Sequence, residues 1–241
     1  MPETFRVACE LLSRVDDSKT GKVCADFHTK IPQWAKDEAK KMATLQGKKM
    51  YNKYEVVKGV KLISQDNLPE MYLNQTWRPA LSITGADGIP SIAKAGNVCR
   101  KSTTLRLAMR LPPNVDPHVA TKNLKAKLTK DVPFGCKVTF DEEAHAGQGY
   151  MMKEPEPYLA SALTKAGSDF FNGKDVGTFG RGGSIPFLAE LGKLYPTTQI
   201  FALGLMGPGT NQHAENERIN LDYAKRLTCS LSHLIAAVGA Q

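Results

Sequence analysis

The sequence has few cysteines and no C-x-x-C pair. The five cysteines are scattered and odd in number: Cys9, Cys24, Cys99, Cys136 and Cys229. This spacing argues against a disulfide framework and a zinc knuckle, and it is typical of free thiols in a reducing compartment. No apolar run approaches the roughly 18 residues that a membrane span needs. The first residues also lack a basic segment followed by an apolar core, so we expect a cytoplasmic protein with no membrane partner.

Aromatic residues are missing where positive charge is densest. The formal net charge of the 241 residues is +8, which is compatible with a nucleic-acid partner, an anionic small-molecule ligand or a solvated basic face. Between Lys94 and Lys130, nine basic residues are opposed only by Asp116, and no aromatic residue lies among them. Because single-stranded nucleic acid is held by stacking on aromatic rings, this composition argues against a nucleic-acid partner.

The first part of the chain predicts a mixture of helices and strands around one sheet. Strand 104–111 has the clearest alternation, with leucines and a methionine on one face and Arg106 and Arg110 on the other. Asp116 followed by Pro117 predicts the N-terminus of a helix. The expected order is helix 2–15, a weak strand 22–31, helix 33–48, strand 80–85, strand 104–111, helix 117–129 and a closing strand 136–140. This order is most of a split βαβ sandwich.

A polar, glycine-containing stretch follows and predicts a domain junction, which we place between residues 145 and 146. Beyond it, the pattern predicts helix 155–171, strands 176–179 and 200–206, and helix 220–238. Alternation of strands and helices favours part of an α/β sheet. Roughly 90 residues are too few for a complete doubly wound domain.

Residues 180–186, GRGGSIP, predict a glycine-rich turn that opens a helix. Free backbone N–H groups at a helix start bind anions, and Arg181 could clamp a carboxylate in a bidentate manner. A tight turn with a surface arginine explains the same residues. The spacing matches neither a Walker loop nor G-x-G-x-x-G.

His213 follows the predicted strand 200–206 in a glycine-containing loop. Such a position is typical of a metal ligand or an acid–base histidine, and equally of an exposed loop histidine. Arg110 has two interpretations as well: it either points into a cleft or lies on a solvated sheet face.

Two sets of motifs resemble one known family. G-G-S-I-P at 182–186, an apolar strand, a glycine loop and H-x-x-N-E at 213–217 resemble the co-catalytic zinc carboxypeptidases and dipeptidases related to carnosinase. Trp77-Arg78-Pro79, Gly85 and Gly88, A-G-N-V at 95–98 and R-L-P-P at 110–113 resemble the lid domain of the same family. The matches recur in the family's order over most of residues 2–238.

The resemblance implies a fold class and an activity. The fold would be α/β with an α+β lid. It would comprise a split βαβ-like lid or dimerisation domain over 1–145 and the C-terminal portion of an α/β zinc-peptidase catalytic domain over 146–241. The enzyme would be a metallopeptidase that hydrolyses dipeptides or releases a C-terminal residue. Its substrate would carry a free C-terminal carboxylate, and the lid would form a homodimer.

The resemblance also implies roles for seven residues. His213 would be the last ligand of a two-zinc centre, and Asn97 and Arg110 would be lid residues that reach the substrate. Gly182, Gly183 and Ser184 would form the turn beside the substrate carboxylate. Arg181 would be the carboxylate clamp, although it stands one position later than the arginine of the dipeptidases.

The resemblance implies that the family's first half carries an H-x-D motif, a bridging aspartate and a Glu-Glu pair that includes the general base. The sequence as given contains no H-x-D motif, and its matches to the family lie outside that first half. One histidine cannot hold a zinc pair. We therefore expect this chain to supply one metal ligand and no catalytic residue, and to be inactive alone. The alternative is a non-catalytic dimerisation or binding module with a basic face.

Overall fold

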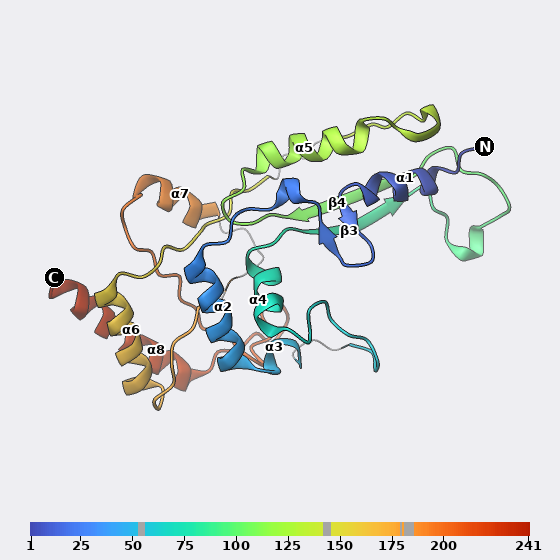
Figure 1. Ribbon diagram of the computed structural model, residues 1–241. Helices are drawn as coiled ribbons and strands as arrows, with labels where there is room; N and C mark the ends of the chain where they lie inside the picture. Colours follow the sequence, from blue (N-terminus) through green and yellow to red (C-terminus); the bar gives the residue numbers. More distant parts are fainter. Residues whose placement is uncertain (53–55, 142–145, 179, 181–185) are drawn as a thin grey trace. The chain divides into compact units, whose positions relative to one another are not determined.

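The computed structural model describes the chain except for residues 53–55, 142–145, 179 and 181–185 (Figure 1). The chain forms two compact units. Unit 1 comprises Met1–Met151 with Gly180–Leu194, and unit 2 comprises Met152–Phe179 with Tyr195–Gln241. The sequence-based boundary at residues 145 and 146 stays a prediction.

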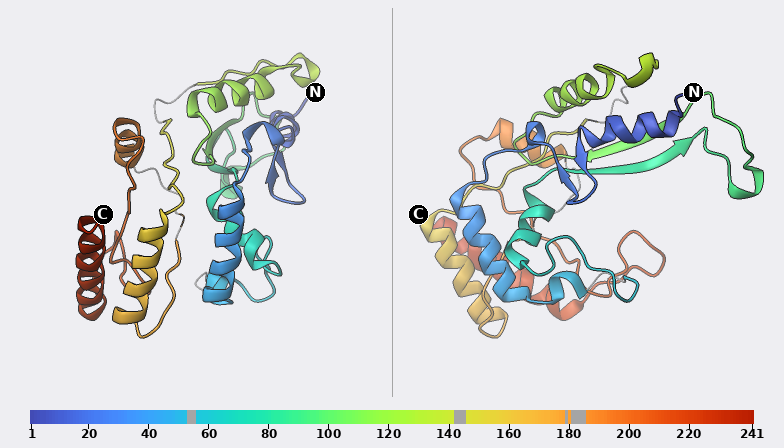
Figure 2. Two further views of the ribbon diagram at one scale, coloured as in Figure 1. Left: turned by 60° about the vertical axis from the view of Figure 1, so that its left-hand side comes forward. Right: turned by 45° about the vertical axis from the view of Figure 1, so that its right-hand side comes forward.

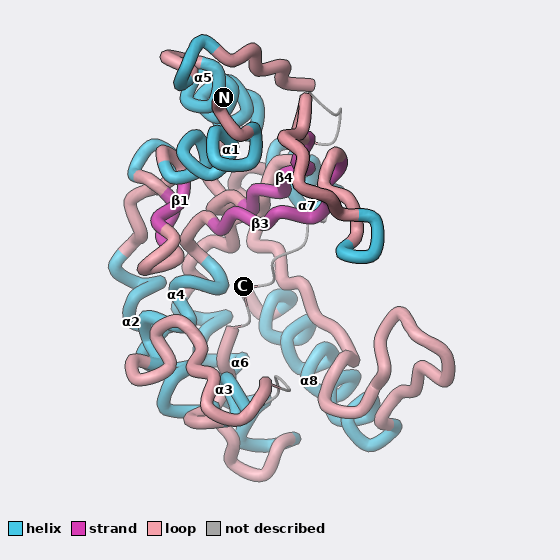
Figure 3. Tube along the Cα trace, turned by 90° about the vertical axis from the view of Figure 1, so that its right-hand side faces the viewer, coloured by secondary structure: helices cyan, strands magenta, loops and turns pink. Residues whose placement is uncertain are grey.

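Unit 1 contains two small antiparallel sheets and most of the helices. Its sheets pair β1 (Asp16–Asp17) with β2 (Lys22–Val23), and β3 (Ala80–Asp87) with β4 (Thr104–Arg110). Its helices are α1 (Thr4–Ser13), η1 (Ala25–Phe27), α2 (Gln33–Gln46), α3 (Lys49–Asn52), α4 (Leu68–Thr76), η2 (Ile92–Lys94), α5 (Pro117–Thr129), η3 (Pro133–Gly135) and α7 (Pro186–Leu194). Figure 3 shows β3 and β4 side by side in magenta.

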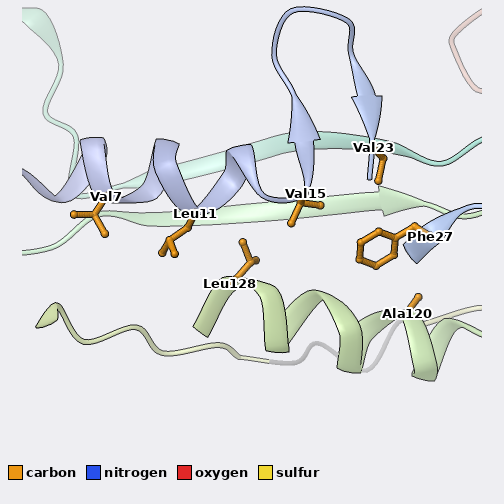
Figure 4. Packing of buried hydrophobic residues seen from close by; sticks show 7 residues of the cluster. All are labelled: Val7, Leu11, Val15, Val23, Phe27, Ala120 and Leu128. Atoms are coloured by element: carbon orange, nitrogen blue, oxygen red, sulfur yellow. The ribbon is translucent and has the colours of Figure 1, made fainter. Parts of the chain in front are cut away.

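Helices α1 and α5 cover one face of the β3–β4 sheet (Figure 1). The core between them contains Val7, Leu11, Val15, Val23, Phe27, Ala120 and Leu128 (Figure 4). Apolar strand residues at alternate positions, including Leu107 and Met109, pack against this core, as the strand pattern predicts. The helix, strand, strand and helix of the predicted sandwich are therefore present, whereas its closing strand at 136–140 is not.

The two helices are held by polar contacts at their ends. The carboxylate of Asp116 accepts hydrogen bonds from the backbone N–H groups of His118 and Val119, which confirms the predicted start of α5. Those bonds favour the ionised carboxylate and lower the pKa of Asp116. At the other end of α5, the guanidinium of Arg14 donates to the carbonyl oxygens of Lys130 at 2.5 Å and Asp131 at 3.0 Å. The side chain of Arg14, the residue that ends α1, thereby hydrogen-bonds the backbone carbonyl groups that follow α5.

A second core of unit 1 lies around α2 and α4. The buried residues are Ala35, Ala39, Met42, Met50, Tyr72, Leu73 and Trp77. The rings of Trp34 and Trp77 meet edge to face with centroids 5.8 Å apart. Next to Trp77, Arg78 contacts Glu70 at 2.6 Å, and this hydrogen bond lowers the pKa of the Glu70 carboxyl. The W-R-P motif thus joins the end of α4 to the start of β3.

Substitution of Gly88 by alanine is expected to destabilise unit 1 by about 1–3 kcal/mol. Gly88 has a φ of +78°, and a Cβ atom there would lie 2.5 Å from the backbone oxygen of Ser102. Gly96 is the matched control, because its φ is not in the left-handed region and a Cβ atom there would meet nothing within 4 Å. Urea unfolding of both variants measures the difference, and equal stabilities would contradict this account of the turn.

Unit 2 is built on two packed helices. Helix α6 (Pro157–Phe170) lies beside α8 (Leu221–Gly239) in both views of Figure 2. Leu159, Ala162 and Ala166 of α6 and Leu234 of α8 are buried. The side chain of Asn220 accepts a hydrogen bond from the backbone N–H of Tyr223 and marks the start of α8.

Several predicted strands are wrong in the described part of the chain. The strand predicted at 22–31 ends at Val23, because the chain turns into η1 and buries Phe27. Residues 136–140, 176–178 and 200–206 belong to neither sheet. An alternating or apolar pattern describes the side-chain faces of a strand, but a strand also needs a neighbour to pair its backbone.

Candidate functional site

His213 lies in a short closed loop of unit 2. The backbone N–H of Arg218 donates to the carbonyl oxygen of Thr210 at 3.0 Å and closes the neck of the loop. The hydroxyl of Thr210 donates to the carbonyl oxygen of Gly207 at 2.8 Å, and Thr210 is buried. The loop is therefore anchored at its neck, while His213 is exposed.

Three residues of this loop have left-handed backbone conformations. The φ angles of Asn211, His213 and Asn216 are +50°, +61° and +59°. Asparagine and histidine are enriched among the non-glycine residues that adopt this region. The side-chain amide of Asn211 also donates to the carbonyl oxygen of Glu215 across the loop. This local chemistry explains why the segment forms a loop that presents the histidine.

The described residues do not form a metal centre. Across the described ranges, no three His, Cys, Asp or Glu side chains come together in a way that could hold a metal ion. The side-chain nitrogen of the neighbouring Gln212 lies 3.3 Å from Nε2 of His213. Zinc sites use three or four protein ligands, so His213 could supply one ligand and does not hold a metal by itself.

Arg110 and Asn97 lie on unit 1, far apart along the β3–β4 hairpin. Arg110 is the last residue of β4, is exposed and pairs with Ala80. Asn97 is exposed in the connection beyond the other end of the hairpin, where Asp87 pairs with Thr104 (Figure 1). The six-residue step from Thr104 to Arg110 corresponds to roughly 20 Å of strand. The structure therefore does not bring these two side chains together within one chain.

The face of the sheet that carries Arg110 is polar and built from small residues. Arg106 and Arg110 share this face with Ala80, Ser82 and Ala108, opposite the face that α1 and α5 cover. The side chains of Arg106 and Arg110 are both exposed to solvent. Such a face suits contact with an anionic group better than packing against an apolar core.

The glycine-rich turn falls mostly outside the described residues. Arg181, Gly182, Gly183 and Ser184 are among the residues that the structure does not describe. Gly180 is described, and a Cβ atom at this position would overlap the side chain of Thr76. The start of the turn thus lies against the C-terminal end of α4, next to the W-R-P motif.

Solved structures of other proteins resemble the fold of this chain, whereas sequence comparisons find no match. No family model matches the sequence, and no curated protein matches it. Among solved structures, an M20 family metallo-carboxypeptidase from Sulfolobus solfataricus matches 97% of this chain with a TM-score of 0.69 and 18% identity. The chain has the fold of about half of an M20 metallopeptidase. It covers 52% of that Sulfolobus chain.

Two further neighbours are similar over the same extent. The dipeptidase Dug1p from Saccharomyces cerevisiae matches 97% of this chain with a TM-score of 0.63 and 20% identity, and this chain covers 49% of it. Human carnosine dipeptidase 1 matches 98% with a TM-score of 0.59 and 17% identity, with 50% of that chain covered. The predicted resemblance to carnosinase-like peptidases and the predicted fold class are confirmed.

The sequence-based search for site residues missed the anchors of the His213 loop. Thr210 and Arg218 close the loop, and only the clustering of Asn residues around His213 could have indicated its left-handed turns. The sequence indicated Gly180 only as part of a turn. Its packing against Thr76 could not be predicted, because the two residues are about 100 positions apart.

None of the described helices combines the length and apolarity needed to cross a membrane.

Proposed function

We propose that this chain is the lid and C-terminal catalytic portion of a zinc-dependent metallopeptidase that hydrolyses dipeptides or releases a C-terminal residue. The likeness to M20 peptidase structures over 97% of the chain carries the proposal. Its location would be the cytoplasm, in keeping with five cysteines that are all unpaired. It would act as a homodimer formed through the lid.

His213 would supply one ligand to a pair of zinc ions, which polarise the scissile carbonyl and activate a water molecule when bound. Among the described residues, no three His, Cys, Asp or Glu side chains could hold a metal ion together, so this chain would contribute mainly to the substrate-binding side of such a site. The remaining ligands and the general base would come from the rest of the peptidase fold. The isolated chain would therefore be inactive.

Asn97 and Arg110 would bind substrate from the lid. The guanidinium of Arg110 can donate two parallel hydrogen bonds to a carboxylate or a developing oxyanion. Because Asn97 and Arg110 lie at opposite ends of the hairpin, the two side chains would contact different parts of the substrate or different sites of a dimer. Gly182, Gly183 and Ser184 would form the turn beside the substrate carboxylate, and Arg181 would clamp it.

Substitution of Arg110 by alanine in the complete enzyme is expected to lower kcat/KM for dipeptides by about 100-fold, the loss typical of one transition-state hydrogen-bond donor. The complete enzyme here means this chain together with the remaining half of the peptidase fold. Lys122 on the exposed face of α5 is the control, and Lys122→Ala should leave kcat/KM unchanged. Steady-state kinetics and a thermal unfolding curve for each variant separate activity from folding. Unchanged kinetics of Arg110→Ala would remove this arginine from the site.

A further inference from the structure

The connection between β3 and β4 carries Asn97 and has little packing of its own. It comprises residues 88–103, all of which the structure describes, and η2 is its only regular element. Its large apolar residues do not fix it to a core, because Ile89, Ile92 and Val98 are 41%, 96% and 79% exposed. A segment with so few buried contacts moves readily unless polar contacts hold it.

Two polar contacts link this connection to the start of α1 (Figure 1). The guanidinium of Arg100 donates to the carboxylate of Glu3 at 2.5 Å, and the hydroxyl oxygens of Thr4 and Thr103 lie 2.7 Å apart. The contact of Thr103 is at the base of the connection, next to the first residue of β4. The contact of Arg100 lies further out, three residues after Asn97.

Glu3 has one partner on each of its carboxylate oxygens. Oε2 accepts a hydrogen bond from the backbone N–H of Arg6 at 2.8 Å and caps α1, while Oε1 accepts from Arg100. The bond from the Arg6 N–H lowers the pKa of Glu3, so the carboxylate is ionised at neutral pH. Because Val7 and Leu11 of the same helix are buried in the core, Glu3 joins the connection to a fixed part of unit 1.

Stability does not explain the presence of Arg100. The side chains of Arg100 and Glu3 are 29% and 35% exposed, and an ion pair so open to water adds little to the free energy of folding. The Nε atom of Arg100 is buried and has no hydrogen-bond partner among the described residues, which costs free energy. The contact is therefore better explained by the geometry that it imposes on the connection.

We propose that Glu3 and Arg100 are positioning residues, which hold the connection against the start of α1 and thereby fix the place from which Asn97 meets the substrate. This inference rests on the proposed function, in which Asn97 binds substrate from the lid. Glu3 and Arg100 act through Asn97 and do not touch the substrate. Without their contact, the Asn97 amide would spend only a small share of its time in the productive geometry.

The first test follows the connection in the 241-residue chain by ¹⁵N relaxation. In Arg100→Ala, which leaves the cap of α1 by Glu3 intact, the order parameter of the Asn97 amide should fall below about 0.6, the range of flexible backbone. Arg100→Lys keeps the charge and should restore the order parameter. Glu10→Gln is the control, because it removes a pair with Arg14 toward the other end of α1 and should change nothing at Asn97. An unchanged order parameter in Arg100→Ala would overturn the proposal.

The second test is a double-mutant cycle on kcat/KM in the complete enzyme. Arg100→Ala should lower kcat/KM by about 10-fold, and Asn97→Ala should lower it by at least as much. The loss in the double variant Arg100→Ala/Asn97→Ala should equal that of Asn97→Ala within about 2-fold, because a positioning residue has no effect once its target is gone. A merely structural contact would give losses that multiply, and that result would overturn the proposal.

The two tests separate this inference from the proposed function. A mobile connection in Arg100→Ala, together with unchanged kinetics of Asn97→Ala, would leave the contact standing and count against Asn97 as a substrate-binding residue. Absence of any hydrolysis would count against the peptidase activity, and the order parameters would still decide whether Glu3 and Arg100 hold the connection. Hydrolysis with losses that multiply would support the activity and remove Glu3 and Arg100 from the positioning of Asn97.

Discussion

Replacement of Phe27 by alanine is expected to lower the free energy of unfolding of unit 1 by about 3–5 kcal/mol. The Phe27 side chain is 0% exposed and lies near Val23 of β2 and Ala120 of α5, at one end of the core cluster (Figure 4). Removal of its ring deletes buried apolar surface and leaves a cavity that the helix and strands around it can only partly close. Both tryptophans of the chain, Trp34 and Trp77, lie in unit 1, so their fluorescence in urea follows the unfolding of this unit.

Phe134 provides the matched control for this experiment. It lies in η3 of the same unit and is 74% exposed, so Phe134→Ala should change the unfolding free energy by no more than about 0.5 kcal/mol. A loss of similar size in both variants would show that the core around α1, α5 and the β3–β4 sheet is not the one described.

Replacement of His213 by alanine in the complete enzyme is expected to reduce kcat by more than about 1,000-fold. Loss of an outer-shell partner of a metal ligand already costs roughly 10- to 100-fold, and loss of the ligand itself costs more. The left-handed loop is closed by backbone bonds at Thr210 and Arg218, so it should keep its shape without the imidazole. Zinc content measured on the purified variant should fall together with activity.

His118 is the control histidine, because it is exposed on α5 and only its backbone N–H contacts Asp116. His118→Ala should retain full zinc content and activity. If His213→Ala also retained both, the imidazole of His213 would not be a metal ligand, and the loop would have to serve substrate binding or structure alone.

Local sequence signals predicted most of the helices and one sheet. Asp116-Pro117 predicted the start of α5, and alternation from residue 104 predicted β4, because capping and half-burial of a strand are determined by residues close in sequence. Helix α8 was predicted from its apolar spacing, although the pattern did not distinguish the face packed on α6 from the exposed residues Leu231, Ile235 and Val238.

Other features depend on contacts that no local pattern contains. The apolar run 200–206 predicts a strand, yet a strand exists only where another backbone pairs with it, and the described residues supply none. The core around α2 and α4 depends on Trp34 meeting Trp77, residues separated by more than forty positions. The roles of Asn97 and Arg110 as lid residues that reach the substrate stay predictions. No local pattern indicates that the long connection between β3 and β4 places Asn97 at the opposite end of the hairpin from Arg110.

The most direct test of the central claim is a zinc titration of the isolated 241-residue chain, with dipeptide hydrolysis followed in the same samples. If the chain holds half of the peptidase fold and a single zinc ligand, it should bind zinc only weakly and hydrolyse no dipeptide. Two tightly bound zinc ions per chain, together with hydrolysis that a chelator abolishes, would contradict the account.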